Sequence, residues 1–108
     1  MRRNGHILGA LDLVILKTLD SAPNHGFGIT LHIQDVSGGL LRVEEGSLYP
    51  ALHRLETQKL VTGEWRQTQN ARKARFYTLT AAGKQRLAEE AESWTAMSKG
   101  VHKVLRFA

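Results

Sequence analysis

The chain has 108 residues, of which 42% are hydrophobic and 23% are charged, and these values are typical of one globular domain. It contains no cysteine, which excludes disulfides, thiolate metal sites and cysteine nucleophiles and agrees with a cytoplasmic protein. The formal net charge is +5, and residues 66–86 hold six basic residues and no acidic one. Local positive charge of this kind favours a polyanionic partner such as nucleic acid.

The first predicted helix covers residues 8–19. Its apolar positions recur at helical spacing, and they include Leu8, Leu11, Ile15 and Leu19. Apolar residues cover most of its circumference, so we expect this helix to be buried or shared with another chain. Asp12 and Lys17 interrupt the run, which argues against a secretory signal. No apolar run approaches the roughly 20 residues that span a bilayer, so no membrane contact is predicted.

A second helix is predicted from about residue 25 to residue 36, with Asn24 as its N-cap. The side chains expected to face inward are Phe27, Leu31 and Val36, with Ile29 and Ile33 close to that stripe. The glycine-rich residues 37–39 end the helix. Residues 40–43, with the sequence LLRV, are predicted to form a short strand.

The third helix is predicted from Ser47, acting as N-cap, to about Lys59. In this position Pro50 is the third helical residue and lies in the first turn, where its missing N–H matters little. Steps of 100° per residue divide the helix into two faces. One face carries Leu48, Ala51, Leu52 and Leu55, and the other carries Tyr49, Pro50, His53, Arg54 and Thr57.

Two strands are predicted at residues 60–66 and 74–80, joined into a hairpin by a polar and basic link. A last helix is predicted at residues 81–106, with Thr80 as its cap. Its apolar stripe is longer than so small a domain can cover. We therefore expect a homodimer through the first and last helices. The interface residues predicted are Leu8, Leu11, Ile15, Leu87, Ala91, Trp94, Met97, Val101, Val104 and Leu105.

The order of elements predicts a mainly α fold with a small β-hairpin, a winged helix-turn-helix. Residues 1–80 would form this DNA-binding domain, and residues 81–108 a C-terminal dimerisation helix. In this fold the third helix enters the major groove and the hairpin lies near the backbone or minor groove. A dimer of such domains faces a two-fold-related site on double-stranded DNA.

Several side chains of the third helix and of the predicted hairpin (residues 60–80), which is called the wing from here on, suit DNA. His53 and Arg54 are donors for base edges, and Ser47 or Tyr49 can bond a phosphate. The wing offers its positive charges to the backbone, from Arg72, Lys73 and Arg75. Each helix residue also has a structural interpretation. In this alternative, Tyr49 would pack on the domain edge, His53 would be a neutral surface residue, and Arg54 would pair with an acid of its own chain.

Other functions find less support in the sequence. The histidines show no metal-binding spacing of the H-E-x-x-H type, and no glycine-rich phosphate loop or nucleophile elbow is present. We therefore predict no metal, no cofactor and no catalytic activity. The alternative function is a protein-interaction module that binds an acidic partner through the same basic face.

The sequence resembles the PadR family of bacterial transcriptional regulators, in particular the short subgroup with one C-terminal helix. The resemblance covers residues 8–105. It is carried by four stretches, which are GALDLVILKTL (9–19), HGFGI (25–29), VEEGSLYPALHRLE (43–56) and ARFYTLTAAGKQRL (74–87). The third and fourth stretches, in this order and spacing, are the most specific.

The resemblance implies a dimeric winged-helix repressor whose third helix reads DNA. That role falls on Ser47, Tyr49, Pro50, His53 and Arg54, and the start of the second helix, His25 and Gly26, would lie near the DNA backbone. Some relatives bind small aromatic effectors near the dimer interface, where Trp94 would line the pocket or fill the dimer core. The chain departs from the family at Lys59, where a glycine is common, so a less sharp helix end is expected.

Overall fold

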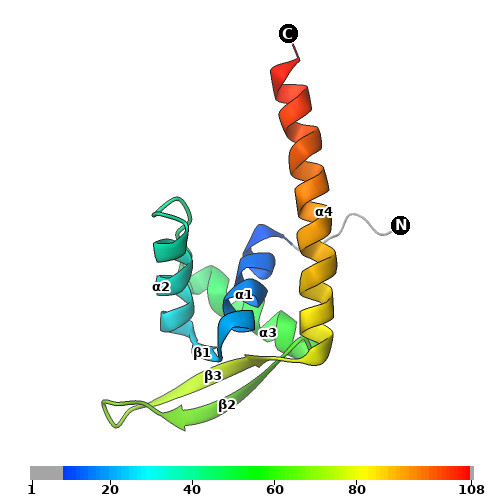
Figure 1. The fold of residues 1–108 in the computed structure, drawn as a ribbon. Coiled ribbons are helices and arrows are strands. Elements are labelled where there is room, and N and C mark those ends of the chain that lie inside the picture. Colours follow the sequence, from blue (N-terminus) through cyan, green and yellow to red (C-terminus); the bar gives the residue numbers. More distant parts are fainter. Residues whose placement is uncertain (1–8, 108) are drawn as a thin grey trace.

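The computed structural model describes residues 9–107, which form four helices and one three-stranded antiparallel sheet of order β1-β3-β2 (Figure 1). The elements are α1 (Ala10–Ser21), β1 (Asn24–His25), α2 (Gly26–Val36), α3 (Glu45–Thr57), β2 (Val61–Gln67), β3 (Lys73–Leu79) and α4 (Ala81–Arg106). The hairpin and the last helix lie within one residue of their predicted bounds. The predicted mainly α winged-helix fold with a long C-terminal helix is confirmed.

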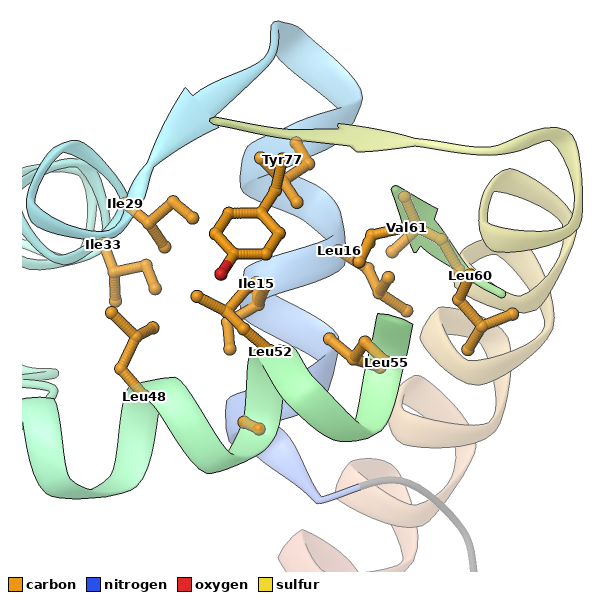
Figure 2. Packing of buried hydrophobic residues seen from close by; sticks show 13 residues of the cluster. Ile15, Leu16, Ile29, Ile33, Leu48, Leu52, Leu55, Leu60, Val61 and Tyr77 are labelled. Atoms are coloured by element: carbon orange, nitrogen blue, oxygen red, sulfur yellow. The ribbon is translucent and has the colours of Figure 1, made fainter. Parts of the chain in front are cut away.

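The core lies between α1, α2 and α3 and the inner face of the hairpin (Figure 2). The predicted inner face of α3 is confirmed, because Leu48, Ala51, Leu52 and Leu55 are all fully buried. The ring of Tyr77 on β3 points into the same cluster. Since strand side chains alternate, the core position of Tyr77 also directs the other odd-numbered side chains of β3 toward the helices.

The inner face of α2 differs from the prediction. Phe27, Leu31 and Val36 are exposed, whereas Ile29 and Ile33 are buried. A helix presents only one stripe to a core on one side, and Ile29 and Ile33 are four residues apart on that stripe. Gly26 continues the buried stripe toward the helix start.

The strand predicted at residues 40–43 is wrong. These residues form no strand, and the third strand of the sheet is β1. Asn24 pairs with Tyr77 and His25 pairs with Phe76 on the free edge of β3. Pro23 explains this position, because the residue before a proline avoids the helical conformation and Ala22 is accordingly extended.

The start of α3 is also earlier than predicted. The N-cap is Glu44, whose carbonyl accepts from the amides of Ser47 (3.0 Å) and Leu48 (2.9 Å). Ser47 therefore lies within the first turn and Pro50 is the sixth helical residue, so the placement of Pro50 in the first turn is wrong. The helix continues through Pro50 because Gly46, whose carbonyl has no N–H partner there, is exposed to water.

The end of α3 is sharp, contrary to the expectation drawn from Lys59. Lys59 adopts a left-handed conformation with φ of 65°. The Leu60 amide donates to the Leu55 carbonyl (2.9 Å) and the Lys59 amide donates to the Glu56 carbonyl (2.9 Å). These two bonds form a complete Schellman motif, which the backbone of any residue can make at a cost in local strain.

Lys59→Gly is expected to raise the free energy of unfolding by about 0.5–1 kcal/mol, because glycine adopts the left-handed conformation without steric cost. Gln58→Gly is the matched control, since Gln58 is right-handed with φ of −80° and glycine there should destabilise the chain. Chemical denaturation of both variants measures the difference. A loss of stability in Lys59→Gly would contradict the strained conformation.

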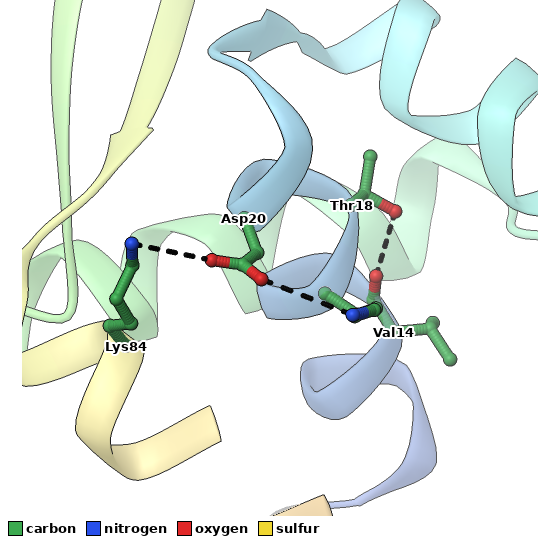
Figure 3. Close-up of polar contacts among 5 residues, drawn as sticks. Val14, Thr18, Asp20 and Lys84 are labelled. Carbon is green, nitrogen blue, oxygen red and sulfur yellow. Dashed lines mark hydrogen bonds and ion pairs between the residues drawn. The ribbon is translucent and has the colours of Figure 1, made fainter. Parts of the chain in front are cut away.

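The base of α4 is attached to the domain and the rest of the helix extends beyond it (Figure 1). Thr80 caps the helix as predicted, accepting from the Gly83 amide at 2.9 Å. In the first turn, Lys84 lies 3.8 Å from Asp20 of α1, which also faces Lys17 at 3.9 Å (Figure 3). The buried residues of α4 are confined to Gly83 and Leu87 within the described chain.

Candidate nucleic-acid interface

The outer face of α3 is polar and accessible. Tyr49, Pro50, His53 and Thr57 are exposed, opposite the buried leucines, as the helical spacing predicted. Tyr49, His53 and Thr57 also line a hollow of about 510 Å³ whose other wall is formed by Arg75 and Tyr77 of β3. The outer polar face of α3 and the base of the hairpin are therefore one continuous surface.

The start of α2 meets this surface through Tyr49. A Cβ atom at Gly26 would collide with the Tyr49 hydroxyl, so the missing side chain leaves room for the Tyr49 ring. His25, rather than the predicted Asn24, caps α2, with Nδ1 accepting from the Gly28 amide at 3.1 Å. This bond leaves the proton of a neutral His25 on Nε2. The N-terminus of a helix beside a tyrosine hydroxyl suits a phosphate group.

Arg54 forms the ion pair with an acid of its own chain that was the structural interpretation of this residue from the sequence. Its Nη2 donates to Oδ1 of Asp12 on α1 at 2.8 Å, and the Asp12 side chain is only 8% exposed. Burial raises the pKa of Asp12 above its usual value, although the charge and hydrogen bond of Arg54 act to lower that pKa. In this structure Arg54 compensates a buried carboxylate through Nη2, while its side chain stays 53% exposed, and its contact with base edges stays a prediction.

The wing tip, Thr68–Arg72, is closed by its own hydrogen bonds. The amide of Thr68 donates to the Arg72 carbonyl at 2.6 Å and the Thr68 hydroxyl donates to the same oxygen at 2.9 Å. Arg72 and Lys73 are both exposed, and neither takes part in an ion pair among residues 9–107. Both cations are thus accessible to an external anion, and their contact with the DNA backbone stays a prediction.

Arg75, the third predicted wing contact, is not free. Its Nη2 donates to Oε2 of Glu56 on α3 at 2.5 Å, and its guanidinium lies 5.8 Å from the centre of the Tyr77 ring. Arg75 is therefore engaged within the chain through Nη2 and remains 32% exposed, and its direct contact with DNA stays a prediction. Glu56 and Asp12 were both missed as site residues. The signal for Asp12 was present, because a lone acid on a largely apolar helix usually needs a partner.

The predicted dimer surface is partly taken up by the chain itself. Ile15 and Leu87 belong to the domain core, so their assignment to an interface is wrong. Leu11 is half-buried and Leu8 lies outside the described residues. The remaining predicted residues are exposed on α4, and they are Ala91, Trp94, Met97, Val101, Val104 and Leu105.

Residues 9–107 contain neither a cluster of metal-ligating side chains nor a membrane-spanning helix. No three histidine, aspartate or glutamate side chains lie close enough to hold a metal ion. No helix in this part of the chain is long and apolar enough to cross a membrane.

The sequence profile of the Transcriptional regulator PadR-like family matches residues 15–89, which include α2, α3, the wing and the base of α4. The chain belongs to the PadR-like family. A transcriptional regulator of Mycobacterium tuberculosis is 36% identical over 77 residues, which cover 71% of this chain and 68% of that protein. A 37.1 kDa protein in a Streptomyces fradiae transposon is 38% identical over 86 residues, but the chain spans only 23% of its length.

Solved PadR-like structures have the same fold. A PadR family regulator from Eggerthella lenta superimposes with a TM-score of 0.79 at 28% identity, over 93% of this chain and 85% of the other. Bacillus subtilis PadR in complex with operator DNA superimposes with a TM-score of 0.67 at 26% identity, over 75% of this chain and 47% of the other. The predicted resemblance to PadR proteins is confirmed.

Proposed function

We propose that this PadR-like protein is a sequence-specific DNA-binding repressor that acts as a homodimer on a two-fold-related operator. One observation carries the proposal. The polar face of α3, the start of α2 and the wing adjoin each other around Tyr49 and the hollow beside it. The structural similarity to Bacillus subtilis PadR, which was solved in complex with operator DNA, supports a DNA-binding role for this chain.

The proposed contacts fall into two groups. His53, with Tyr49 and Pro50 beside it, would face base edges in the major groove. Phosphates would be held by the remaining contacts, which are Ser47, the α2 start at His25 and Gly26, and the wing cations Arg72 and Lys73. Arg54 and Arg75 would support this surface through their ion pairs. The proposal includes no catalytic step and places the protein in the bacterial cytoplasm, where its DNA target lies.

The exposed stripe of α4 would form the dimer, with residues 1–80 as the reading domain and residues 81–108 as the dimerisation helix. Trp94, Met97 and Val101 lie on this stripe and are about half-exposed in the single chain. A partner would remove their apolar surface from water, and that removal favours association. A small aromatic effector that lies against Trp94 would compete with this packing and release DNA.

Specific binding to a duplex from the upstream region of its own operon is the expected result, measured by fluorescence anisotropy against an unrelated duplex. Arg72→Ala with Lys73→Ala should reduce the slope of log affinity against log salt by about 2, because each lost phosphate contact removes roughly one unit. The matched control is Lys99→Ala with Lys103→Ala, which removes the same charge from the exposed far part of α4.

The control should leave the salt slope unchanged. Equal slopes in the wild type and the Arg72, Lys73 variant would exclude the wing from the interface. Failure of the wild type to prefer any operon duplex at about 50 mM salt would contradict the proposed function itself, since low salt favours phosphate contacts. Binding of an acidic protein under the same conditions would then favour an interaction module.

A further inference from the structure

The ion pair between Glu56 and Arg75 joins the recognition helix to the wing. Glu56 lies on the last turn of α3, and Arg75 lies on β3, 19 residues later in the chain. Their side chains are 33% and 32% exposed, so the pair is only partly screened by water. Both residues line the hollow that Tyr49 and His53 also line.

The guanidinium of Arg75 is held on more than one side. It lies over the ring of Tyr77, which is buried in the core, and the cation is attracted to the face of that ring. It also crosses Gly63 of β2, where a Cβ atom would lie 2.7 Å from Nε and from Nη2. Gly63 is the strand partner of Tyr77, so both strands of the wing shape the place that Arg75 occupies.

The charge of Glu56 does not favour DNA directly. A carboxylate on the surface that meets DNA repels phosphates, and here it also neutralises one of the wing's cations. Coulomb's law alone therefore predicts that removing Glu56 tightens DNA binding. The pair would instead orient the hairpin, because a planar guanidinium group that is hydrogen-bonded to a carboxylate restricts how the hairpin lies relative to α3.

We propose that Glu56 is a positioning residue for DNA recognition, which fixes the wing against the recognition helix so that Arg72 and Lys73 reach the backbone while His53 faces the groove. The inference rests on the proposed function. It assigns Glu56 and Arg75 a role that neither makes through its own contact with DNA.

Glu56→Ala tests the proposal because the two roles of Glu56 predict opposite changes in DNA affinity. Loss of a positioning contact would weaken specific binding, whereas loss of a negative charge would tighten it. We expect the affinity for the specific duplex to fall at least about tenfold, while the affinity for an unrelated duplex stays equal or rises. The slope of log affinity against log salt should fall by about 2, because Arg72 and Lys73 lose their phosphate contacts. The matched control is Glu64→Ala. It removes an equally negative group from the other face of the wing, where Glu64 pairs with Arg66 at 3.1 Å.

Glu64→Ala should bind as tightly as the wild type or slightly more tightly. Glu56→Gln, which keeps an acceptor oxygen, should lose affinity in the same direction by a smaller factor, and it replaces the alanine variant if that variant does not fold. The double variant Glu56→Arg with Arg75→Glu exchanges the two charges, and it should bind the specific duplex at least about three times more tightly than Glu56→Ala does. Circular dichroism at the assay temperature confirms folding in each case.

Wild-type affinity and salt slope in a folded Glu56→Ala variant would overturn the positioning role while leaving the proposed function intact. Tighter specific binding in that variant would also overturn it and would assign Glu56 a purely electrostatic effect. If the wild type does not discriminate between duplexes, the proposed function fails and this inference falls with it.

Discussion

Replacing Arg54 by alanine is expected to lower the free energy of unfolding by about 2 kcal/mol at pH 7, because it leaves the buried carboxylate of Asp12 without its partner. Breaking a fully buried ion pair costs more, but Arg54 is 53% exposed and water replaces part of its charge. The measurement is denaturation by guanidinium chloride, followed by circular dichroism.

The loss in Arg54→Ala should depend on pH. Burial raises the pKa of Asp12, and the two effects that lower this pKa both come from Arg54. The variant therefore has a still higher pKa for folded Asp12. A carboxyl group whose pKa is raised on folding stabilises the fold below its unfolded pKa, and this stability disappears as pH rises through the folded pKa. The difference from the wild type should thus be largest at pH 7 and shrink toward pH 4.

The second substitution Asp12→Asn should restore most of the stability of Arg54→Ala, because the neutral amide has no charge to leave unpaired. Lys17→Ala is the matched control, since Lys17 is 73% exposed and lies 3.9 Å from Asp20. It should change stability by less than about 0.5 kcal/mol. A cost equally small in Arg54→Ala, or no rescue by Asp12→Asn, would show that the Asp12 carboxylate is not held by Arg54.

Gly83→Ala is expected to lower the free energy of unfolding by about 3 kcal/mol, because its methyl group would collide with Leu60, which lies between α3 and β2. A Cβ atom at Gly83 would lie against the carbonyl oxygen of Leu60, closer than real Cβ contacts allow, and 2.7 Å from a methyl carbon of Leu79. The Leu60 carbonyl cannot move aside freely, because it accepts from the Thr80 amide at 3.1 Å. Overpacking against backbone usually costs 1–3 kcal/mol or more.

Gly100→Ala on the same helix is the matched control for Gly83→Ala. Nothing lies within 4 Å of a Cβ atom at Gly100, so the change should stabilise the helix by about 1 kcal/mol. The two variants carry the same substitution and should differ in sign when chemical denaturation is compared. Equal stabilities would contradict the close packing of α4 on Leu60.

The candidate site was predictable in part. Helical spacing alone separated the buried face of α3 from Tyr49, His53 and Thr57, because burial on a helix follows the 3.6-residue period. The free cations Arg72 and Lys73 followed from the polar composition of the wing tip. An ion pair was one of two interpretations of Arg54, but its partner Asp12 and the pair between Arg75 and Glu56 did not follow, since each joins elements that are distant in the chain.

The errors in the predicted fold also arose mainly where contacts between separate elements decide the local structure. Residues 40–43 are capable of forming a strand, but β3 had one free edge and the segment before α2 occupies it. The inward side of α2 was ambiguous because apolar residues lie on more than one side, and only the packing against α1 and α3 selects Ile29 and Ile33. Lys59 lacks the freedom of glycine, yet its backbone still completes the Schellman motif.

The sequence by itself determined the order of the four helices and the hairpin, the inner face of α3 and the extent of α4 from Thr80 onward, because these depend on periodicity, capping and strand propensity within short segments. Only the tertiary structure decided which charged groups are free. Asp12 pairs with Arg54 and Glu56 pairs with Arg75, because folding brings residues of α1 and β3, which are distant from α3 in the chain, close to α3.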